Sequence, residues 1–313
     1  PGSPMADPFG CFTHALVRAL PPPGDPHEEA LGVAAPPGPP PDPAKARRQW
    51  GVLGGVLRQR LGLQLLELPP TRGGLRALLL EELVVVQGGT ALLTRPGPPR
   101  REELGGLREV LEQLQLRVLS VTDEGAALDG GDVLFTGEFG ETPGTSPGWE
   151  PPWSQLSPAP PGREFFVGIS PWTNLRGAEA VADAFRDFTV STVPVGGGGR
   201  LKGFCSMAAP QTIAHGSSDG ARRAIKAMEQ LSDHPYSRLA LPDDPAGNCL
   251  FTRPGGLPGG VLLHRGPDEF PLSQKAFQKV PGVSLVPLDL SEAAKVGGAL
   301  SSSCVLLWAR PGG

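Results

Sequence analysis

Short apolar runs recur along the chain at a nearly constant spacing. Five of them close an amphipathic stretch, at residues 62–69, 115–121, 188–195, 237–242 and 283–290. Counted from equivalent positions in these runs, the spacings are 53, 72, 49 and 46 residues. The interval of 72 residues contains a Pro-rich segment of 25 residues, 138–162, and without it the interval is 47 residues. A period of this size is typical of a repeated supersecondary unit.

Each apolar run is followed by two stretches that we interpret as the strands of a hairpin. The predicted pairs are 80–87 with 90–96, 129–137 with 163–170, 200–208 with 211–218, and 247–253 with 260–266. The stretch 301–311 has no such partner after it, whereas 13–20, near the start, has the same pattern. We therefore expect 13–20 to pair with 301–311, because closure removes an exposed sheet edge.

A helical pattern follows the second strand of each hairpin. In residues 101–116, leucines at 104, 107, 111 and 114 lie three or four positions apart and form one helical face. The other predicted helices are 44–61, 176–188, 219–231 and 273–280. The unit is therefore strand, strand, helix, strand, and it occurs five times. This predicts an α/β fold, a closed five-bladed pseudosymmetric ring with blade strands around an axis and helices outside.

Two Pro-rich segments interrupt the repeat. We expect a single domain over 11–311, in which 21–43 forms a flap or loop and 138–162 is a disordered insertion. The formal net charge of −4 argues against a nucleic-acid partner, and no apolar run is long enough for a membrane span. Four cysteines far apart, without a CxxC pair, favour a reducing compartment and no metal site. A cytoplasmic protein without a cofactor is expected, with mitochondrial association as an option.

Polar residues converge on the predicted axis, because each first hairpin strand begins there. These positions hold Glu81 and Glu82, Asp129, Arg200, Asn248, and residues 302–304. Three carboxylates facing one pocket, with a nucleophile opposite, suit a cationic substrate that is attacked at an electrophilic carbon. Glu81 and Glu82 as a merely solvated turn remain an alternative.

Several long motifs resemble one known family. They are LDGGDVLFTG (128–137), TNLRGAEAVADAFRDF (173–188), KGFCSMA (202–208), LPDDPAGNCL (241–250) and the tail LSSSCVLLWARP (300–311). Together they resemble dimethylarginine dimethylaminohydrolase, and the tail is closer to the second vertebrate isoform than to the first. That family is a pentein, a five-fold pseudosymmetric α/β propeller, in agreement with the repeat count.

The resemblance implies hydrolysis of asymmetric dimethylarginine or monomethylarginine to citrulline and an alkylamine, and through it regulation of nitric oxide synthesis. In the family a thiolate attacks the guanidinium carbon, a histidine donates the proton and carboxylates hold the guanidinium. A resonance-stabilised guanidinium needs a strong nucleophile, and the departing amine needs a proton donor near neutrality.

The resemblance also assigns candidate site residues. The guanidinium would be held by Glu81, Glu82 and Asp129, and the substrate carboxylate by Arg100. Val296 matches a backbone contact, and Leu31 stands in for a flap leucine. Ungapped comparison with the first isoform places Ser302 at the nucleophile position, whereas comparison with the second selects Cys304, which we favour as the stronger nucleophile. Because strands have a period of two, both side chains are expected on one face.

Three positions depart from the family pattern. Arg76 replaces an aspartate, Trp172 replaces an arginine, and Arg200 replaces the catalytic histidine. Arginine stays protonated and cannot donate a proton near neutral pH, and it would repel a guanidinium substrate. Two functions therefore remain open: a hydrolase that acts on methylated arginines, and an inactive member that acts as a binding or regulatory scaffold.

Overall fold

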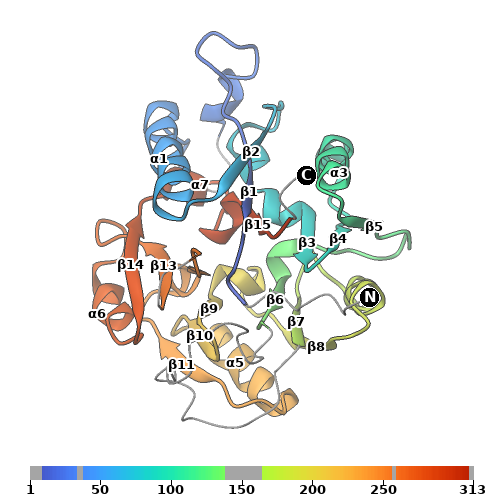
Figure 1. Cartoon of the computed structure of the whole chain (residues 1–313), viewed down its shortest axis with the longest axis vertical. Coiled ribbons are helices and arrows are strands. Elements are labelled where there is room, and N and C mark those ends of the chain that lie inside the picture. Colours follow the sequence, from blue (N-terminus) through green and yellow to red (C-terminus); the bar gives the residue numbers. More distant parts are fainter. Residues whose placement is uncertain (1–8, 34–37, 138–163, 256–258, 310–313) are drawn as a thin grey trace.

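Five three-stranded sheets surround a common centre, with the longer helices toward the outside (Figure 1). The computed structural model describes residues 9–33, 38–137, 164–255 and 259–309. The predicted insertion 138–162 lies outside the described residues. No hydrogen-bonded ladder joins one described sheet to the next, so the arrangement is propeller-like rather than a continuous barrel.

One unit shows the repeated order. Strand β3 (Val84–Gln87) runs antiparallel to β4 (Thr90–Leu93), helix α3 (Glu103–Gln113) crosses over, and β5 (Arg117–Ser120) pairs parallel with β4. Leu107 and Leu111 are the buried residues of α3, as the leucine spacing predicts. A parallel third strand requires such a crossover, and an amphipathic helix supplies it.

The next three units repeat this order. They are β6 (Val133–Phe135), β7 (Glu164–Ile169), α4 (Leu175–Ala184) and β8 (Thr189–Pro194); β9 (Cys205–Ala209), β10 (Thr212–His215), α5 (Asp219–Leu231) and β11 (Ser237–Ala240); and β12 (Leu250–Thr252), β13 (Gly260–Arg265), α6 (Gln274–Phe277) and β14 (Val283–Leu288). In each, the first pair of strands is antiparallel and the second pair is parallel.

The fifth unit joins the two ends of the described chain. Strand β15 (Val305–Leu307) pairs antiparallel with β1 (His14–Arg18), which pairs parallel with β2 (Gln64–Leu68) after helix α1 (Pro43–Gly55). His14 lies opposite Leu307, and Leu16 lies opposite Val305. The predicted pairing of 13–20 with 301–311 is confirmed, and so is the count of five units.

The first strand of every unit begins later than predicted, because its first residues form a short 3-10 turn. The five turns are η4 (Leu80–Leu83), η5 (Gly130–Asp132), η7 (Leu201–Gly203), η8 (Asp244–Gly247) and η10 (Ser301–Ser303). In η5, for example, the Asp129 side chain accepts a hydrogen bond from the Gly131 amide. Such a local side-chain bond competes with the strand ladder and favours the turn at η5.

The five turns contact one another in sequence and form a ring around the axis, which we call the turn ring. Two hydrogen bonds link η8 and η10 through the side chain of Asn248, which directly follows η8. Its Nδ2 donates to Ser301 Oγ at 2.9 Å, and its Oδ1 accepts from the Ser301 backbone N–H at 2.8 Å. Packing is closest at Gly130, where a Cβ atom would lie 1.9 Å from the Glu81 carbonyl oxygen. Glycine is therefore required there.

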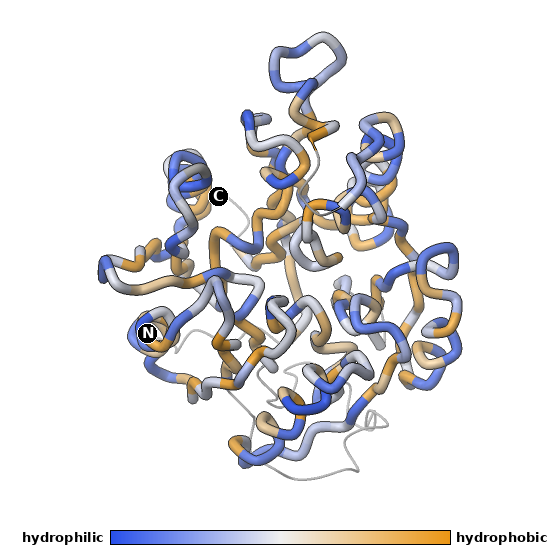
Figure 2. The backbone as a smooth tube through the Cα atoms, turned by 180° about the vertical axis from the view of Figure 1, so that it is seen from behind, coloured by the Kyte–Doolittle hydropathy of each residue, from blue (hydrophilic) through white to orange (hydrophobic). Residues whose placement is uncertain are grey.

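Apolar side chains fill the space between the sheets and their helices. One cluster surrounds Phe165, whose ring centroid lies 4.8 Å from that of Phe135 and 4.9 Å from that of Phe185. In Figure 2 the outer helices carry hydrophilic stretches beside hydrophobic ones, as helices with one buried face do. None of the helices in the described ranges combines the length and apolar character that a membrane span needs.

The remaining described elements connect the units. They are η1 (Glu29–Gly32), the π-helical turn η2 (Val56–Arg60), η3 (Gly74–Leu78), α2 (Pro98–Arg101), η9 (Pro271–Ser273) and α7 (Ser291–Ala294). The first of these lies in the Pro-rich segment 21–43, and its Leu31 is fully buried in a cluster that includes Leu75 and Val296.

Candidate functional site

Two cavities adjoin the turn ring. The first, about 560 Å³, is lined mainly by loops that precede the turns, and we call it the loop cavity; its lining includes Arg76, Trp172, Gly198, Gly199, Arg200, Lys202, Lys295, Val296 and Ser302. The second, about 210 Å³, is lined mainly by the strands that follow the turns, and we call it the strand cavity; its lining includes Phe9, Glu81, Val133, Phe165, Met207, Cys249, Phe251, Ser301 and Cys304. Lys202 lines both cavities.

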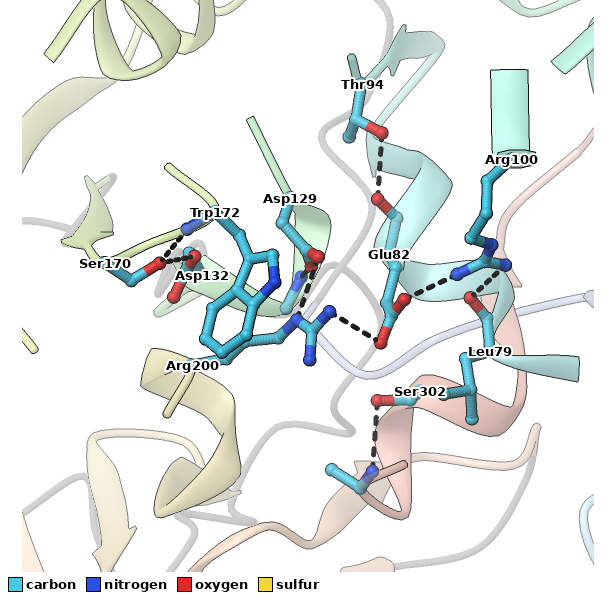
Figure 3. Close-up of polar contacts among 12 residues, drawn as sticks. Leu79, Glu82, Thr94, Arg100, Asp129, Asp132, Ser170, Trp172, Arg200 and Ser302 are labelled. Carbon is cyan, nitrogen blue, oxygen red and sulfur yellow. Dashed lines mark hydrogen bonds and ion pairs between the residues drawn. The ribbon is translucent and has the colours of Figure 1, made fainter. Parts of the chain in front are cut away.

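Glu82 and Asp129 are both held by arginines (Figure 3). One carboxylate oxygen of Glu82 lies 2.5 Å from Arg100 Nη1, and the other lies 3.1 Å from Arg200 Nη2. Asp129 Oδ2 accepts a hydrogen bond of 2.8 Å from Arg200 Nε. Glu82 is 3% exposed and Asp129 is 8% exposed, so these ion pairs are shielded from water.

The Arg200 guanidinium lies between these two carboxylates and stacks on an aromatic ring. Its central carbon is 4.5 Å from the ring centroid of Trp172, a cation–π distance. Burial alone would lower the pKa of Arg200, but the carboxylates of Asp129 and Glu82 raise it above its usual value. Arg200 is therefore a fixed cation on the wall of the loop cavity.

A second set of hydrogen bonds holds Asp129 and its turn in place. The Asp129 amide donates to Thr173 Oγ1 at 3.0 Å, and Thr173 Oγ1 in turn donates to Asp132 Oδ2 at 2.7 Å. Asp132 also accepts from Ser170 Oγ and from the Leu201 amide. Asp132 thus ties the turn that carries Asp129 to the turn that begins next to Arg200.

Two of the acidic groups have raised pKa values. Burial raises the pKa of Glu82 to about 7, and repulsion by Asp129 adds to it, against the attraction of Arg200 and Arg100. Burial likewise raises the pKa of Asp132 to about 6, although the hydrogen bonds from Ser170, Leu201 and Thr173 act in the opposite direction.

Glu81 points to other partners than Glu82. Its carboxylate lies 2.5 Å from Lys202 Nζ and accepts a hydrogen bond of 2.7 Å from Ser301 Oγ. Because Ser301 is also bonded to Asn248, this chain of contacts links η4, η7, η8 and η10. Sequence reasoning did not assign Lys202 or Ser301 to the site, although both stand in motifs that carry the family resemblance.

Ser302 and Cys304 do not share a face. Residues 301–303 form the turn η10 rather than strand, so the expectation of a period of two is wrong here. Ser302 lines the loop cavity, and its Oγ accepts a hydrogen bond from the Ala299 amide at 3.2 Å. Cys304 lines the strand cavity and belongs to an apolar cluster. Burial raises the pKa of Cys304 to about 12, and the nearby Glu81 adds to this.

The remaining predicted site residues occupy different places. Val296 lines the loop cavity. Arg100 is buried between Glu82 and Glu103 and donates to the Leu79 carbonyl, whereas Leu31 is a core residue. Among the described residues, no group of three or more His, Cys, Asp or Glu is placed to hold a metal ion.

Known proteins resemble this chain along nearly its whole length, although no family model matches it. The human protein DDAH2 is 51% identical over 307 residues, which covers 97% of each chain. The N(G),N(G)-dimethylarginine dimethylaminohydrolase of Streptomyces coelicolor is 37% identical over 98 residues, 31% of this chain and 37% of that protein. The chain belongs to the dimethylarginine dimethylaminohydrolase family.

Solved structures share the fold of this family member. A mutant of the DDAH from Pseudomonas aeruginosa, complexed with citrulline, superposes with a TM-score of 0.70 at 17% identity and covers 95% of this chain and 100% of its own. A mutant of the N-terminal domain of ArgZ, a cyanobacterial arginine dihydrolase, bound to its substrate, has a TM-score of 0.66 at 15% identity, with 95% and 98% covered. These structures therefore share their fold with this chain.

Proposed function

We propose that this chain binds a small molecule in the loop cavity without hydrolysing methylated arginines. One observation carries the proposal: the guanidinium of Arg200 lies between Asp129 and Glu82 and stacks on Trp172. Two carboxylates beside an aromatic face are the groups that recognise a guanidinium. The family resemblance assigns this role in substrate binding to the same carboxylates, and here a side chain of the protein itself occupies them.

An incoming methylarginine would have to displace Arg200. That exchange breaks two shielded ion pairs and leaves the Arg200 charge in or near the cavity, where it repels the cationic substrate. Because Arg200 is covalently attached, it competes at a high effective concentration. The position that the resemblance assigns to the proton donor is thus occupied by a group that competes with the substrate.

The candidate nucleophiles also support binding without turnover. A pKa of about 12 leaves on the order of one Cys304 thiol in 10⁵ ionised at pH 7. Cys304 moreover lines the strand cavity and not the loop cavity. Ser302 does line the loop cavity, but its Oγ is bonded to a backbone amide and to no base within the described residues.

Hydrolysis of methylated arginines is the second candidate. It is favoured by membership of the family and by the convergence of Glu82 and Asp129 on one guanidinium, that of Arg200. In that case Ser302 or Cys304 would be the nucleophile, Arg200 would have to leave the carboxylates, and the products would be citrulline and an alkylamine. The family resemblance would then also imply a part in the regulation of nitric oxide synthesis. It implies a closed pentein ring as well.

Citrulline formation by the purified protein separates the two candidates. With asymmetric dimethylarginine and monomethylarginine as substrates, we expect no citrulline above the level of a Ser302→Ala and Cys304→Ala double variant. Calorimetry with the same compounds should show no heat of binding. Citrulline production that the double variant abolishes would establish the hydrolase and refute the proposal.

The variant Arg200→His then tests the cause. If Arg200 alone blocks the carboxylates, this substitution should allow dimethylarginine to bind, detectable by calorimetry even without turnover. The control is Arg222→His, at an exposed position on α5 whose ion pair, within the described chain, is with Asp219. Binding that appears equally in both variants would show that Arg200 is not the obstacle.

A further inference from the structure

The charged side chains that line the loop cavity are all cations. Within the described residues they are Arg76, Arg200, Lys202 and Lys295. The carboxylates that balance three of them do not line this cavity: Glu82, Asp129 and Glu292 are 3%, 8% and 2% exposed, and Glu81 lines the strand cavity. A molecule in the loop cavity therefore meets positive charge in front of buried negative charge.

Arg76 is the cation without a counter-ion. Its side chain is exposed and makes no ion pair or hydrogen bond with the described residues. Its charge nevertheless reaches the site, because it lowers the pKa of Glu82 against the effect of burial. Arg76 is thus the lining cation that has no ion pair of its own within the described residues.

Further donors face the same space. Arg200 uses Nε and Nη2 on the carboxylates, while its Nη1 has no hydrogen-bond or ion-pair partner within the described residues (Figure 3). Gly198 and Gly199 line the cavity, and their amides donate no hydrogen bond within the described chain. A Cβ atom at either glycine would meet nothing within 4 Å, so the backbone there is open to a ligand.

We infer that the loop cavity binds a small organic anion that carries carboxylate or phosphate groups. This inference rests on the proposed function, because Arg200 must remain on Asp129 and Glu82 and present only its Nη1. Guanidinium groups and free backbone amides are the usual partners of such anions. A cavity of about 560 Å³ is in the range of small-ligand sites. Carboxylate and phosphate ligands share this chemistry, and the experiment separates them.

Isothermal titration of the full chain with citrate and, separately, with inorganic phosphate tests the inference. We expect one site per chain with a dissociation constant below about 1 mM for at least one of them. Binding should weaken as the salt concentration rises, because the cations lie near the surface. If only citrate binds, the ligand is a carboxylate; if only phosphate binds, it is a phosphate. Methylguanidinium should not bind.

Three variants locate the site. Arg76→Ala should weaken binding at least about tenfold, and Arg76→Lys should weaken it less, because the charge is retained. Arg222→Ala removes an exposed cation outside the cavity and should leave the affinity unchanged. Arg76 is exposed, so loss of binding through misfolding is not expected, and a thermal melt of each variant checks this.

Two results would overturn the inference: no binding of either anion at concentrations well above about 1 mM, or binding that Arg76→Ala leaves unchanged. The proposed function is tested by a different measurement, because citrulline formation from a methylated arginine would refute it. If the protein forms no citrulline and binds neither citrate nor phosphate, only the anion site is refuted. A protein that makes citrulline and still binds citrate refutes only the inactive role.

Discussion

The loop cavity and the strand cavity share an axis and one lining residue, Lys202, yet their chemistry is opposite. The loop cavity has cations on its wall, with carboxylates buried behind them. The strand cavity is lined largely by phenylalanines and valines, with Glu81 and Lys202 at one place and three cysteines. Burial raises the pKa of two of these thiols, Cys249 and Cys304, to about 12. The turn ring separates them, so a shift of two residues along η10 moves a side chain from one environment to the other.

This difference shows that the repeated unit places charged side chains on one side of the turn ring and apolar side chains on the other. Residues in and before the turns satisfy their polar groups through hydrogen bonds and ion pairs, most of which join different units, so charge gathers on that side. Residues in the strands that follow alternate between sheet faces and pack on neighbouring units, so that side becomes apolar. The Cys304 thiol on the strand side is buried and stays protonated. The nearby Glu81 does not activate it, since a negative charge raises the pKa of the thiol further.

Among the changes considered, removing the Arg200 side chain should lower the free energy of unfolding most. In Arg200→Ala, the buried carboxylates of Asp129 and Glu82 lose their shared cation, and we expect a loss of about 3–5 kcal/mol in the free energy of unfolding. Millimolar methylguanidinium should restore part of this loss in the variant and none in the wild type. Chemical denaturation with and without the ligand measures both. Equal stabilisation of the two proteins would mean that the carboxylates already accept an external guanidinium.

The repeat and its closure could be predicted from the sequence because they depend on patterns that recur. The leucines of 101–116 predict one helical face, on which Leu107 and Leu111 are buried, and the pattern shared by 13–20 and 301–311 predicts their pairing, which β1 and β15 make. Spacing alone also brought Glu82, Asp129 and Arg200 to one place. What it could not show is that Arg200 folds back onto both carboxylates, since that contact joins residues 71 and 118 positions apart.

The turns were missed for a related reason. Runs such as LEELVVVQ have the composition of a strand, and periodicity does not reveal that Leu80–Leu83 turns before the strand begins. Residues 301–303 also form a turn, so Ser301 and Cys304 line the strand cavity while Ser302 lines the loop cavity, an order that a strand period of two does not give. The hydrophobic pattern therefore sets the frame, while the chemistry of the site depends on contacts between side chains far apart in the sequence.

The separation of the cavities should be sensitive to the close packing of the turn ring. In Gly130→Ala, the new Cβ would lie 1.9 Å from the Glu81 carbonyl, and we expect a loss of about 1–3 kcal/mol. The matched control is Gly105→Ala on the exposed side of α3, where nothing lies within 4 Å and a gain of about 0.5–1 kcal/mol is expected. Urea unfolding compares them. Similar effects in both variants would show that the ring tolerates looser packing.

The smallest expected effect is on the pH dependence of stability, through the protonation of Glu82 and Asp132. Because the pKa of Glu82 is raised to about 7, and that of Asp132 to about 6, the folded state binds more protons than the unfolded state from about pH 4.5 to 7. The free energy of unfolding should therefore fall by about 1–3 kcal/mol as the pH rises through this window. Glu82→Gln should remove the larger share of this slope, whereas Glu112→Gln, on the surface of α3, should leave it intact. Stability that rises with pH over the same range would mean that Arg100 and Arg200 outweigh burial. Glu82 would then be fully ionised at neutral pH, and its ion pairs with Arg100 and Arg200 would be complete.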